Sequence, residues 1–304
     1  MRIVIHIGAN KAASTTLQNH LFSTNSNIHY VGEGSSRYRE YSSIIMELAE
    51  TDDVFWNLDV AELFFQQQLS EANGRTFVYS DEDIMTSPIS SLCARRLYRL
   101  FPSAFVLMII RNQFTALPSF YANHGAYLRP APPPYYKRYV SFENWLRFNF
   151  DVILYGPIAS FDYWRFAEYF DGLFGADRIK ILMYEDILHN RNKFCADLGN
   201  LLNIDHADVK QVLETFRERK RVSSRALNFH RLLSILIGKG IKLNEPLTDG
   251  WLGQRFAAFV AGGTPVESVI PASWIDRIAR RYAEGNVRLA VKYRLPLKAY
   301  GYPM

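Results

Sequence analysis

Residues 2–16 of the chain read Arg-Ile-Val-Ile-His-Ile-Gly-Ala-Asn-Lys-Ala-Ala-Ser-Thr-Thr. The β-branched and apolar residues of 2–7 predict a buried strand, which Gly8 ends. Ser14 or Thr15 can cap a helix that runs to about Phe22. This stretch therefore predicts a strand, a short loop and a helix in immediate succession.

The same alternation continues along the chain. Buried strands are expected over 76–80, 105–110 and 179–183, and the apolar run at 105–110 predicts a central parallel strand. Helices are expected over 87–100, from about 113, over 142–151 and 161–174, and through most of the chain after about 206. The pattern predicts an α/β fold with a doubly wound parallel sheet flanked by helices. We expect one domain over 1–304, with the sheet within about 1–205 and a largely helical C-terminal part at about 206–304.

Composition excludes several classes of protein. The 304 residues are 48% hydrophobic and 21% charged, which excludes a mainly disordered chain. We expect no membrane-spanning segment and no signal peptide, because no apolar run is long enough. Two cysteines cannot form a disulfide framework, so we expect a cytoplasmic protein. The net charge of +5 is spread along the chain without basic blocks, which favours a small anionic ligand over nucleic acid.

The loop at residues 8–16 has the composition of an anion site. Unpaired amides at a helix N-terminus attract anions, and the small side chains of Ala12 and Ala13 let the backbone approach a phosphate. Lys11 adds a positive charge, and three hydroxyl donors follow: Ser14, Thr15 and Thr16. An ordinary capped turn is the alternative interpretation. The loop is not a Walker A motif, because no Gly-Lys pair precedes the helix.

A second anion site is predicted where the strand at 105–110 ends. Arg111 follows that strand and can grip an anion with its guanidinium, and Ser119 would lie on the second turn of the next helix. An arginine paired with a carboxylate at the sheet edge is the alternative. Two anion sites at neighbouring strand ends together suggest one ligand with two separated phosphates.

These residues resemble a known family. Strand-Gly-x-x-Lys-x-x-Ser/Thr-Thr-x-Leu-Gln resembles the 5′-phosphosulfate loop of bacterial, carbohydrate-type sulfotransferases that use 3′-phosphoadenosine 5′-phosphosulfate (PAPS). Arg-Asn-x6-Ser-x-Tyr over 111–121 resembles their 3′-phosphate motif. Weaker similarities lie in Phe-Gly to Tyr-Glu-Asp over 174–186 and in Arg-Val-Ser-Ser-Arg over 221–225. The resemblance implies a P-loop-like fold.

The chain departs from this pattern at four positions. Ala12 and Ala13 stand where the family usually has Thr-Gly, which removes a hydroxyl donor and a flexible glycine. Gln113 and Ala116 stand where the 3′-phosphate motif has proline and a second arginine. The resemblance leaves Arg225 as a residue that could compensate for the missing arginine.

The resemblance implies transfer of a sulfuryl group from PAPS to an acceptor hydroxyl or amine, with a saccharide or glycan favoured as acceptor and no metal required. Lys11 would stabilise the charge on the leaving phosphate. Residues Ala12 to Thr16 would hold the 5′-phosphate, and Arg111 with Ser119 would hold the 3′-phosphate. The proline-rich loop over 127–139, with its tyrosines and cations, would cover the acceptor.

The acceptor must also lose a proton to a base. Glu82 is the first candidate, because it follows the strand at 76–80, and Glu33 is its rival. For Glu82 the alternative is a solvated acidic turn, and for Glu33 a plain surface turn. His6 is a weaker candidate, with a hydrogen-bonded residue at a strand end as its alternative.

Two other functions stay open. A magnesium-dependent kinase or other phosphoryl transferase would use Thr15 and Asp81 to hold the metal, although the loop lacks the Walker A pattern. A non-catalytic nucleotide-binding relative is the other alternative, and the departures at Ala12, Ala13, Gln113 and Ala116 favour it.

Overall fold

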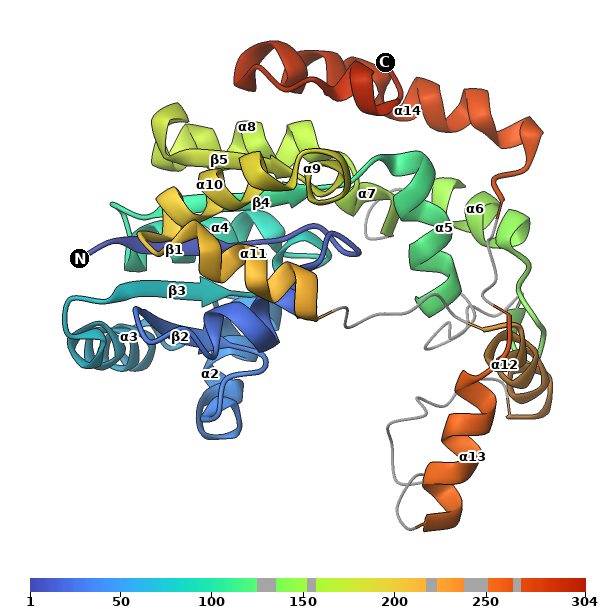
Figure 1. Cartoon of the computed structure of the whole chain (residues 1–304), viewed down its shortest axis with the longest axis horizontal. Coiled ribbons are helices and arrows are strands. Elements are labelled where there is room, and N and C mark those ends of the chain that lie inside the picture. The colour runs from blue at the N-terminus through green and yellow to red at the C-terminus, as the bar shows by residue number, and fades with distance from the viewer. Residues whose placement is uncertain (125–134, 152–156, 217–222, 238–250, 265–268) are drawn as a thin grey trace. The chain divides into compact units, whose positions relative to one another are not determined.

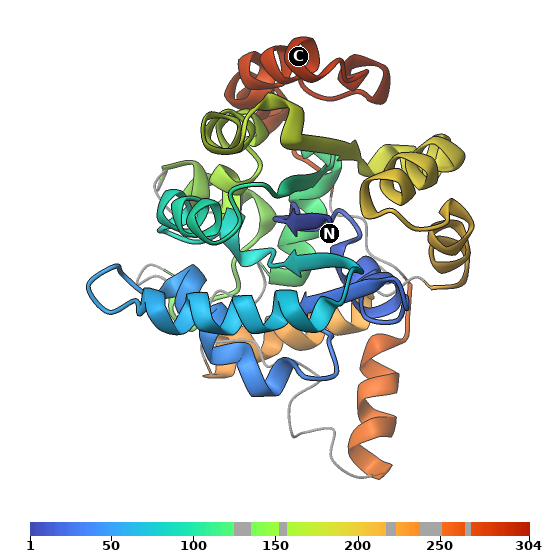
Figure 2. The same cartoon turned by 90° about the vertical axis from the view of Figure 1, so that its left-hand side faces the viewer.

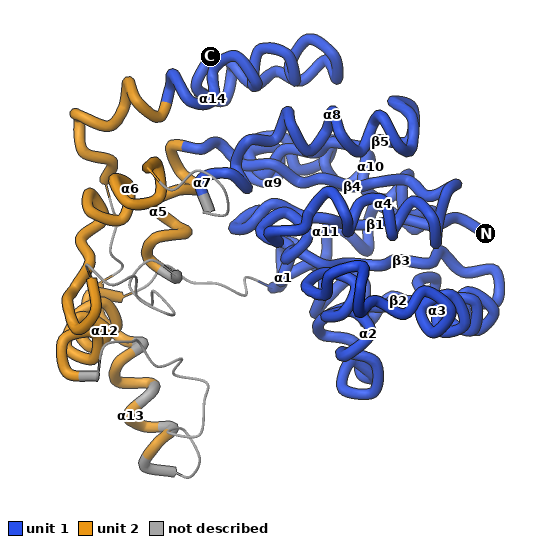
Figure 3. Tube along the Cα trace, turned by 180° about the vertical axis from the view of Figure 1, so that it is seen from behind, with its two compact units in different colours: residues 1–113, 153–218, 279–304 blue, residues 114–152, 219–278 orange. Residues whose placement is uncertain are grey.

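The computed structural model describes residues 1–304 except 125–134, 152–156, 217–222, 238–250 and 265–268. The chain divides into two compact units, shown in different colours in Figure 3. The first unit comprises residues 1–113, 153–218 and 279–304, and the second comprises 114–152 and 219–278. Each unit is built from segments far apart in the sequence.

The first unit contains a five-stranded, all-parallel sheet (Figure 1). The strands are β1 (Ile3–His6), β2 (Ile28–Gly32), β3 (Thr76–Ser80), β4 (Phe105–Ile110) and β5 (Ile179–Met183). Their order is β2-β3-β1-β4-β5, so β1 lies in the centre. Four of the five strands lie where the sequence predicts them, and the α/β class with a parallel sheet is confirmed.

Helices cover both faces of this sheet. Figure 2 shows α4 (Ser90–Leu100) and α8 (Tyr163–Phe174) on one side of the strands, and α10 (Arg191–Leu202) and α11 (His206–Thr215) on the other. Coverage of both faces makes the sheet doubly wound, which explains why its strands are largely apolar. The other helical segments of this unit are α1 (Ser14–Leu17), a π-helix η1 (Gln18–Phe22), α2 (Tyr38–Glu50), α3 (Leu58–Ala72), the short η2 (Asp83–Met85), α7 (Pro157–Ser160), η5 (Ala176–Arg178), α9 (Tyr184–His189) and η7 (Leu297–Tyr300).

Aromatic side chains fill the core between sheet and helices. On the α3 and α4 side, Phe65 contacts the rings of Tyr79 and Phe101 edge to face. On the η1 side, Phe22 packs against His6 and Tyr30. The register pairs His6 with Ser80 and Ser80 with Gly32, which brings the ends of β1, β2 and β3 to one edge.

The second unit is helical in the residues that the structure describes. It holds most of α5 (Gln113–His124), then α6 (Phe142–Asp151), α12 (Ser224–Ile237), α13 (Trp251–Ala261) and the start of α14 (Ala272–Tyr293). The buried rings of Tyr121 and Trp145 pack together, and the Tyr121 hydroxyl donates to the Val140 carbonyl at 2.7 Å. The helical part expected after residue 206 is confirmed in these described segments, although its last helix returns to the first unit.

The longest stretch missing from the sequence prediction holds three successive elements: β2, α2 and α3. They occupy 28–72, which the sequence analysis left without assigned structure. The helix expected from Ser87 begins later, at Ser90, because the Ser87 hydroxyl accepts from the Ile89 amide in a turn before it. No described helix is long and apolar enough to span a membrane.

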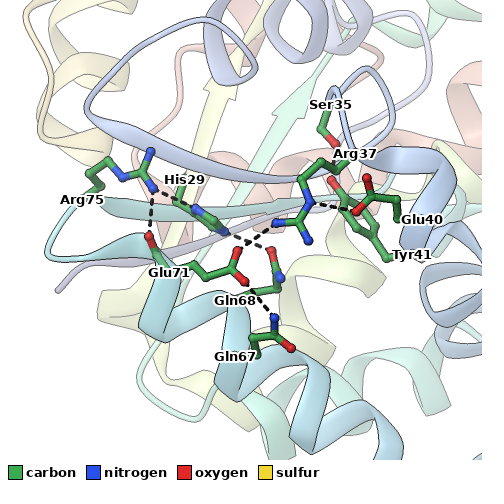
Figure 4. Close-up of polar contacts among 9 residues, drawn as sticks. All are labelled: His29, Ser35, Arg37, Glu40, Tyr41, Gln67, Gln68, Glu71 and Arg75. Atoms are coloured by element: carbon green, nitrogen blue, oxygen red, sulfur yellow. Dashed lines mark hydrogen bonds and ion pairs between the residues drawn. The ribbon is translucent and has the colours of Figure 1, made fainter.

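A polar cluster fastens β2 to α3 at the edge of the sheet. Figure 4 shows the His29 imidazole between the Arg75 guanidinium and the Gln68 side chain, at 3.0 and 3.1 Å. Arg37 bridges to Glu40 and Glu71, at 2.9 Å each. Arg75 can only donate, so Nδ1 of His29 accepts its hydrogen bond and the ring is neutral. These bonds use the hydrogen-bonding groups of the histidine within the fold.

Candidate functional site

The loop between β1 and α1 is held in an unusual backbone conformation. Gly8 has a φ of 37°, and both Lys11 and Ala13 have a φ of 70°. Lys11 and Ala13 alternate with Ala12, whose φ is not positive, and such alternation can turn backbone amides toward one concave side, as in an anion-binding nest. Only glycine fits at the first position, because a Cβ there would lie 2.8 Å from Ser14 Oγ and 3.0 Å from the His6 ring.

The start of α1 corrects the expected cap. Ser14 is the first residue of the helix, and the position before it is Ala13, whose side chain cannot accept a hydrogen bond. Neither Ser14 nor Thr15 therefore caps the helix. Ala13 offers no side-chain acceptor for the amides of the first turn, so these amides stay directed at the loop.

Two buried polar atoms face this loop. Ser14 Oγ and His6 Nε2 are both buried and have no hydrogen-bond partner among the described residues. Both lie on the same side of Gly8, within about 3 Å of where a Cβ of that residue would stand. A buried hydroxyl without a partner costs free energy, about 1–3 kcal/mol. It is typical of a site whose partner arrives with a ligand.

Arg111 lies against the loop. Its Nη1 donates to the carbonyl oxygen of Lys11 at 2.9 Å, and its Cζ lies 4.6 Å from the centre of the Tyr184 ring. The Tyr163 hydroxyl donates to the Arg111 carbonyl at 2.7 Å and fixes the backbone there. The ends of β1 and β4 thus bring Lys11 and Arg111 together.

The Tyr-Glu-Asp segment holds the residue after Arg111. Glu185 accepts from the Asn112 amide at 2.9 Å and from the Tyr302 hydroxyl at 2.8 Å. Asp186 accepts from the Tyr300 hydroxyl at 2.6 Å. The sequence analysis assigned no contact with the strand end to the C-terminal tyrosines. The alternating Tyr-Gly-Tyr at 300–302 is the only sequence signal that could have suggested it.

Two departures from the 3′-phosphate motif have structural explanations. Gln113 is fully buried and exchanges hydrogen bonds with Asn286 of α14, at 3.1 and 3.2 Å. It also donates to the Phe161 carbonyl at 3.1 Å. Proline at this position could not form these bonds. Ala116 is also fully buried, so this position is a core alanine.

The two candidate bases lie near one tyrosine at the same edge of the sheet. The Tyr30 hydroxyl donates to the Glu33 carbonyl at 2.6 Å. Burial raises the pKa of Tyr30 well above its ordinary value, and the charges of Glu33 and Glu82 add to this rise. Glu82 is partly buried and Glu33 is exposed, which favours Glu82 as the group held in a defined place.

Asp81 is a neighbouring carboxylate with a different environment. Burial raises its pKa to about 7, although two hydrogen bonds to the carboxylate act to lower that pKa. These come from the Asp83 amide at 2.9 Å and the Tyr79 hydroxyl at 3.2 Å. The hydrogen bond from the Tyr79 hydroxyl places the Asp81 carboxylate just beyond the end of β3.

Two candidate residues lie in the second unit. Ser119 is partly buried in α5, which begins at Gln113 as expected. Arg225 is exposed on α12, with its Cζ 4.6 Å from the centre of the Phe259 ring. Their roles in binding a ligand stay predictions. Of the loop expected over 127–139, residues 127–134 lie outside the described part of the chain.

No model of a known protein family and no curated protein sequence matches the chain. The solved structures that are similar to it include three sulfotransferases. A sulfotransferase from Alicyclobacillus acidocaldarius is 15% identical, with 79% of this chain and 97% of that chain covered and a TM-score of 0.47.

The other two are sulfotransferase domains. The sulfotransferase domain of the Synechococcus PCC 7002 olefin synthase is 14% identical, with 97% and 95% of the two chains covered and a TM-score of 0.44. The sulfotransferase domain from the curacin biosynthetic pathway is 15% identical, with 87% and 98% covered and a TM-score of 0.41. Each of these three structures is thus a sulfotransferase or a sulfotransferase domain.

Proposed function

We propose that the protein is a sulfotransferase that moves a sulfuryl group from PAPS to an acceptor hydroxyl or amine. The observation that carries this proposal is the pairing of the loop with Arg111, whose Nη1 lies 2.9 Å from the Lys11 carbonyl. Two cationic side chains at adjacent strand ends suit a nucleotide with two separated phosphate groups. The buried Ser14 hydroxyl and the left-handed loop backbone fit a phosphate oxygen.

The chemistry assigned to the residues is simple. The bond between sulfur and the bridging phosphate oxygen breaks as the acceptor oxygen or nitrogen bonds to sulfur, and adenosine 3′,5′-bisphosphate leaves. Lys11 stabilises the charge that develops on the leaving phosphate, while residues 12–16 hold its other oxygens. Arg111 holds the 3′-phosphate, with Ser119 and Arg225 as further proposed contacts. Glu82, with Glu33 as its rival, takes the proton that the acceptor loses.

A saccharide acceptor is part of this proposal. Its support is the exposed aromatic and basic chemistry after residue 134. The Tyr136 ring is 60% exposed, and the Lys137 ammonium lies 5.9 Å from its centre. Exposed tyrosines suit stacking on a sugar ring, and the cation suits an anionic glycan. We also propose, from the composition of the chain, that the reaction takes place in the cytoplasm.

Thermal unfolding with added nucleotides tests the proposed function. Adenosine 3′,5′-bisphosphate without metal should raise the melting temperature, since a ligand that binds only the folded state stabilises it by about 2.7 kcal/mol at a hundred times its Kd. A rise only with ATP and Mg²⁺ would favour the kinase, in which Thr15 and Asp81 hold the metal. No rise with either nucleotide would favour the non-catalytic relative.

Four variants test the assigned roles. Lys11→Ala should lower turnover by a hundredfold or more with a smaller loss of nucleotide affinity. Arg111→Ala should mainly weaken binding, by tenfold or more, because it removes a cation and the support of the Lys11 carbonyl. With a true acceptor, Glu82→Gln should abolish most turnover while Glu33→Gln keeps it. The reverse result would move the base to Glu33.

A further inference from the structure

His6 connects the interior of the sheet to the anion loop. It is the last residue of β1 and is fully buried. Its Nδ1 lies 2.8 Å from Ser80 Oγ on β3, and Ser80 Oγ also accepts from Gln18 Nε2 at 3.0 Å. Its Nε2 points to the other side, toward Gly8 and Ser14. One ring nitrogen is therefore anchored in the core while the other faces the loop.

Gln18, Ser80 and His6 form a chain of hydrogen bonds, whose donors and acceptors can be followed from Gln18. The Gln18 amide donates to Ser80 Oγ, which leaves the Ser80 hydrogen for Nδ1 of His6. A neutral histidine that accepts at Nδ1 carries its hydrogen on Nε2. Burial lowers the pKa of His6 to about 3, so the ring is neutral at physiological pH. The Nε2–H group is then a donor directed toward the side of Gly8 where Ser14 Oγ lies.

Hydrogen bonds that run in the opposite direction, from His6 to Ser80, would not suit an anion bound at the loop. The Tyr30 hydroxyl also lies within reach of Ser80. If Ser80 donated to Tyr30, His6 would donate from Nδ1 and its Nε2 would be an acceptor. Nε2 would then compete for the Ser14 hydrogen and turn the Ser14 lone pairs toward the ligand. Only a hydrogen on Nε2 leaves the Ser14 hydrogen available to a phosphate oxygen.

We propose that His6 is a positioning residue of the anion loop, which donates from Nε2 to Ser14 Oγ when an anion is bound and so directs the Ser14 hydroxyl toward it. This inference rests on the proposed function, because it takes the ligand to be a nucleotide phosphate. The chain then runs from Gln18 through Ser80, His6 and Ser14 to the anion. Hydrogen bonds that point the same way strengthen one another.

Nuclear magnetic resonance of the ring tests the proposed tautomer without any variant. Protein labelled with ¹⁵N at its seven histidines should show a neutral ring with hydrogen on Nε2 that stays neutral well below pH 6, in addition to the rings of His29 and His230, whose pKa values burial also lowers. Loss of that signal in His6→Gln assigns it to His6. The Nε2–H resonance should shift on addition of adenosine 3′,5′-bisphosphate. A His6 ring with hydrogen on Nδ1, or one that is charged at pH 7, would overturn the proposal.

A double-mutant cycle tests the coupling to Ser14. We expect His6→Asn, which keeps a polar group near Ser80 and removes Nε2, to weaken binding of adenosine 3′,5′-bisphosphate about tenfold. Ser14→Ala should have a similar effect, and the double variant should be no worse than Ser14→Ala alone. His6→Gln, whose amide reaches toward the position of Nε2, should recover most of the affinity. Losses that multiply to about a hundredfold would show that His6 acts independently of Ser14 and would overturn the proposal.

The two proposals can fail separately. Failure of the unchanged protein to bind the bisphosphate would contradict the proposed function. Normal binding by the unchanged protein, with full affinity in a folded His6→Asn variant, would contradict only the role of His6. Circular dichroism and melting without ligand establish that each variant is folded. If His6→Asn does not fold, the ring tautomer and the affinity of His6→Gln decide the question.

Discussion

Ala13 carries a backbone conformation that its side chain disfavours. Its φ of 70° is left-handed, and a residue with a Cβ pays roughly 1–2 kcal/mol there. We therefore expect Ala13→Gly to stabilise the protein by about 1 kcal/mol, measured as the free energy of unfolding in urea. Affinity for the bisphosphate should be kept or improved, because the loop backbone is unchanged.

Ala12 provides the matched control for this substitution. It is adjacent and fully buried, but its φ is not positive. Ala12→Gly should destabilise by about 1 kcal/mol, since glycine gains freedom in the unfolded chain and a buried methyl is lost. If both glycine variants are destabilised alike, the left-handed strain assigned to Ala13 is wrong.

The sequence predicted which residues form the loop but not how they are held. Lys11, Ser14 and Arg111 could be recognised because their types and spacing follow two strand ends. The hydrogen bond from Arg111 to the Lys11 carbonyl could not be foreseen, since backbone acceptors leave no mark on composition. The buried state of Ser14 was equally hidden, because it depends on the sign of φ at Gly8 and Ala13.

At the scale of elements, the C-terminal segment supports the end of β4. The buried Tyr302 hydroxyl donates to Glu185 Oε2 at 2.8 Å, and Glu185 accepts from the Asn112 amide beside Arg111. Tyr302→Phe should cost about 1.5–3 kcal/mol of unfolding free energy, the range for hydrogen bonds to charged groups. It should also weaken bisphosphate binding, because Asn112 fixes the backbone next to Arg111.

Tyr136→Phe is the control for that loss of a hydroxyl, since its ring is 60% exposed. We expect it to change the unfolding free energy by less than about 0.5 kcal/mol. A Tyr302→Phe variant as stable as Tyr136→Phe would show that the C-terminal segment does not hold the strand end.

The strands that the sequence predicted share runs of apolar residues that are mostly buried, although Lys180 of β5 is exposed. Residues 76–80 and 105–110 are nearly continuous apolar runs because both faces of the sheet are covered. The edge strand β2, Ile28–Gly32, was missed because its histidine, tyrosine and glycine break such a run. A signal for α2 was present, since Tyr41, Ile45 and Leu48 are buried at helical spacing.

At the scale of the molecule, contacts between distant segments are the part that no local pattern could supply. The first unit takes residues from three separate stretches of the chain, and Gln113 meets Asn286 across 173 positions. Pairings of this kind depend on the completed fold. The burial of ionisable groups also depends on the completed fold, and the effects of these groups on stability add over the whole molecule.

Buried ionisable groups of opposite kind should shape the dependence of stability on pH. Burial lowers the pKa of His6 to about 3 and that of His230 to about 4, and it also lowers the pKa of His29. These groups bind protons more readily in the unfolded chain, so stability should fall as the pH drops below about 6.5. Asp81 acts in the opposite sense, because its pKa is raised to about 7.

Asp81→Asn separates these contributions. Between pH 5 and about pH 7 the folded wild-type protein holds a proton on Asp81 that the unfolded chain has released, so this group makes the protein less stable as the pH rises through that range. The unfolding free energy of Asp81→Asn minus that of the wild type should therefore be larger at pH 8 than at pH 5, by about 2 to 3 kcal/mol. Urea unfolding at both pH values measures this difference, with Asp59→Asn, an exposed carboxylate on α3, as the control. Parallel stability curves for wild type and Asp81→Asn would mean that Asp81 is ionised in the folded protein. In that case only the buried histidines would make stability depend on pH, by lowering it at acid pH. Asp81 would then carry no proton at neutral pH.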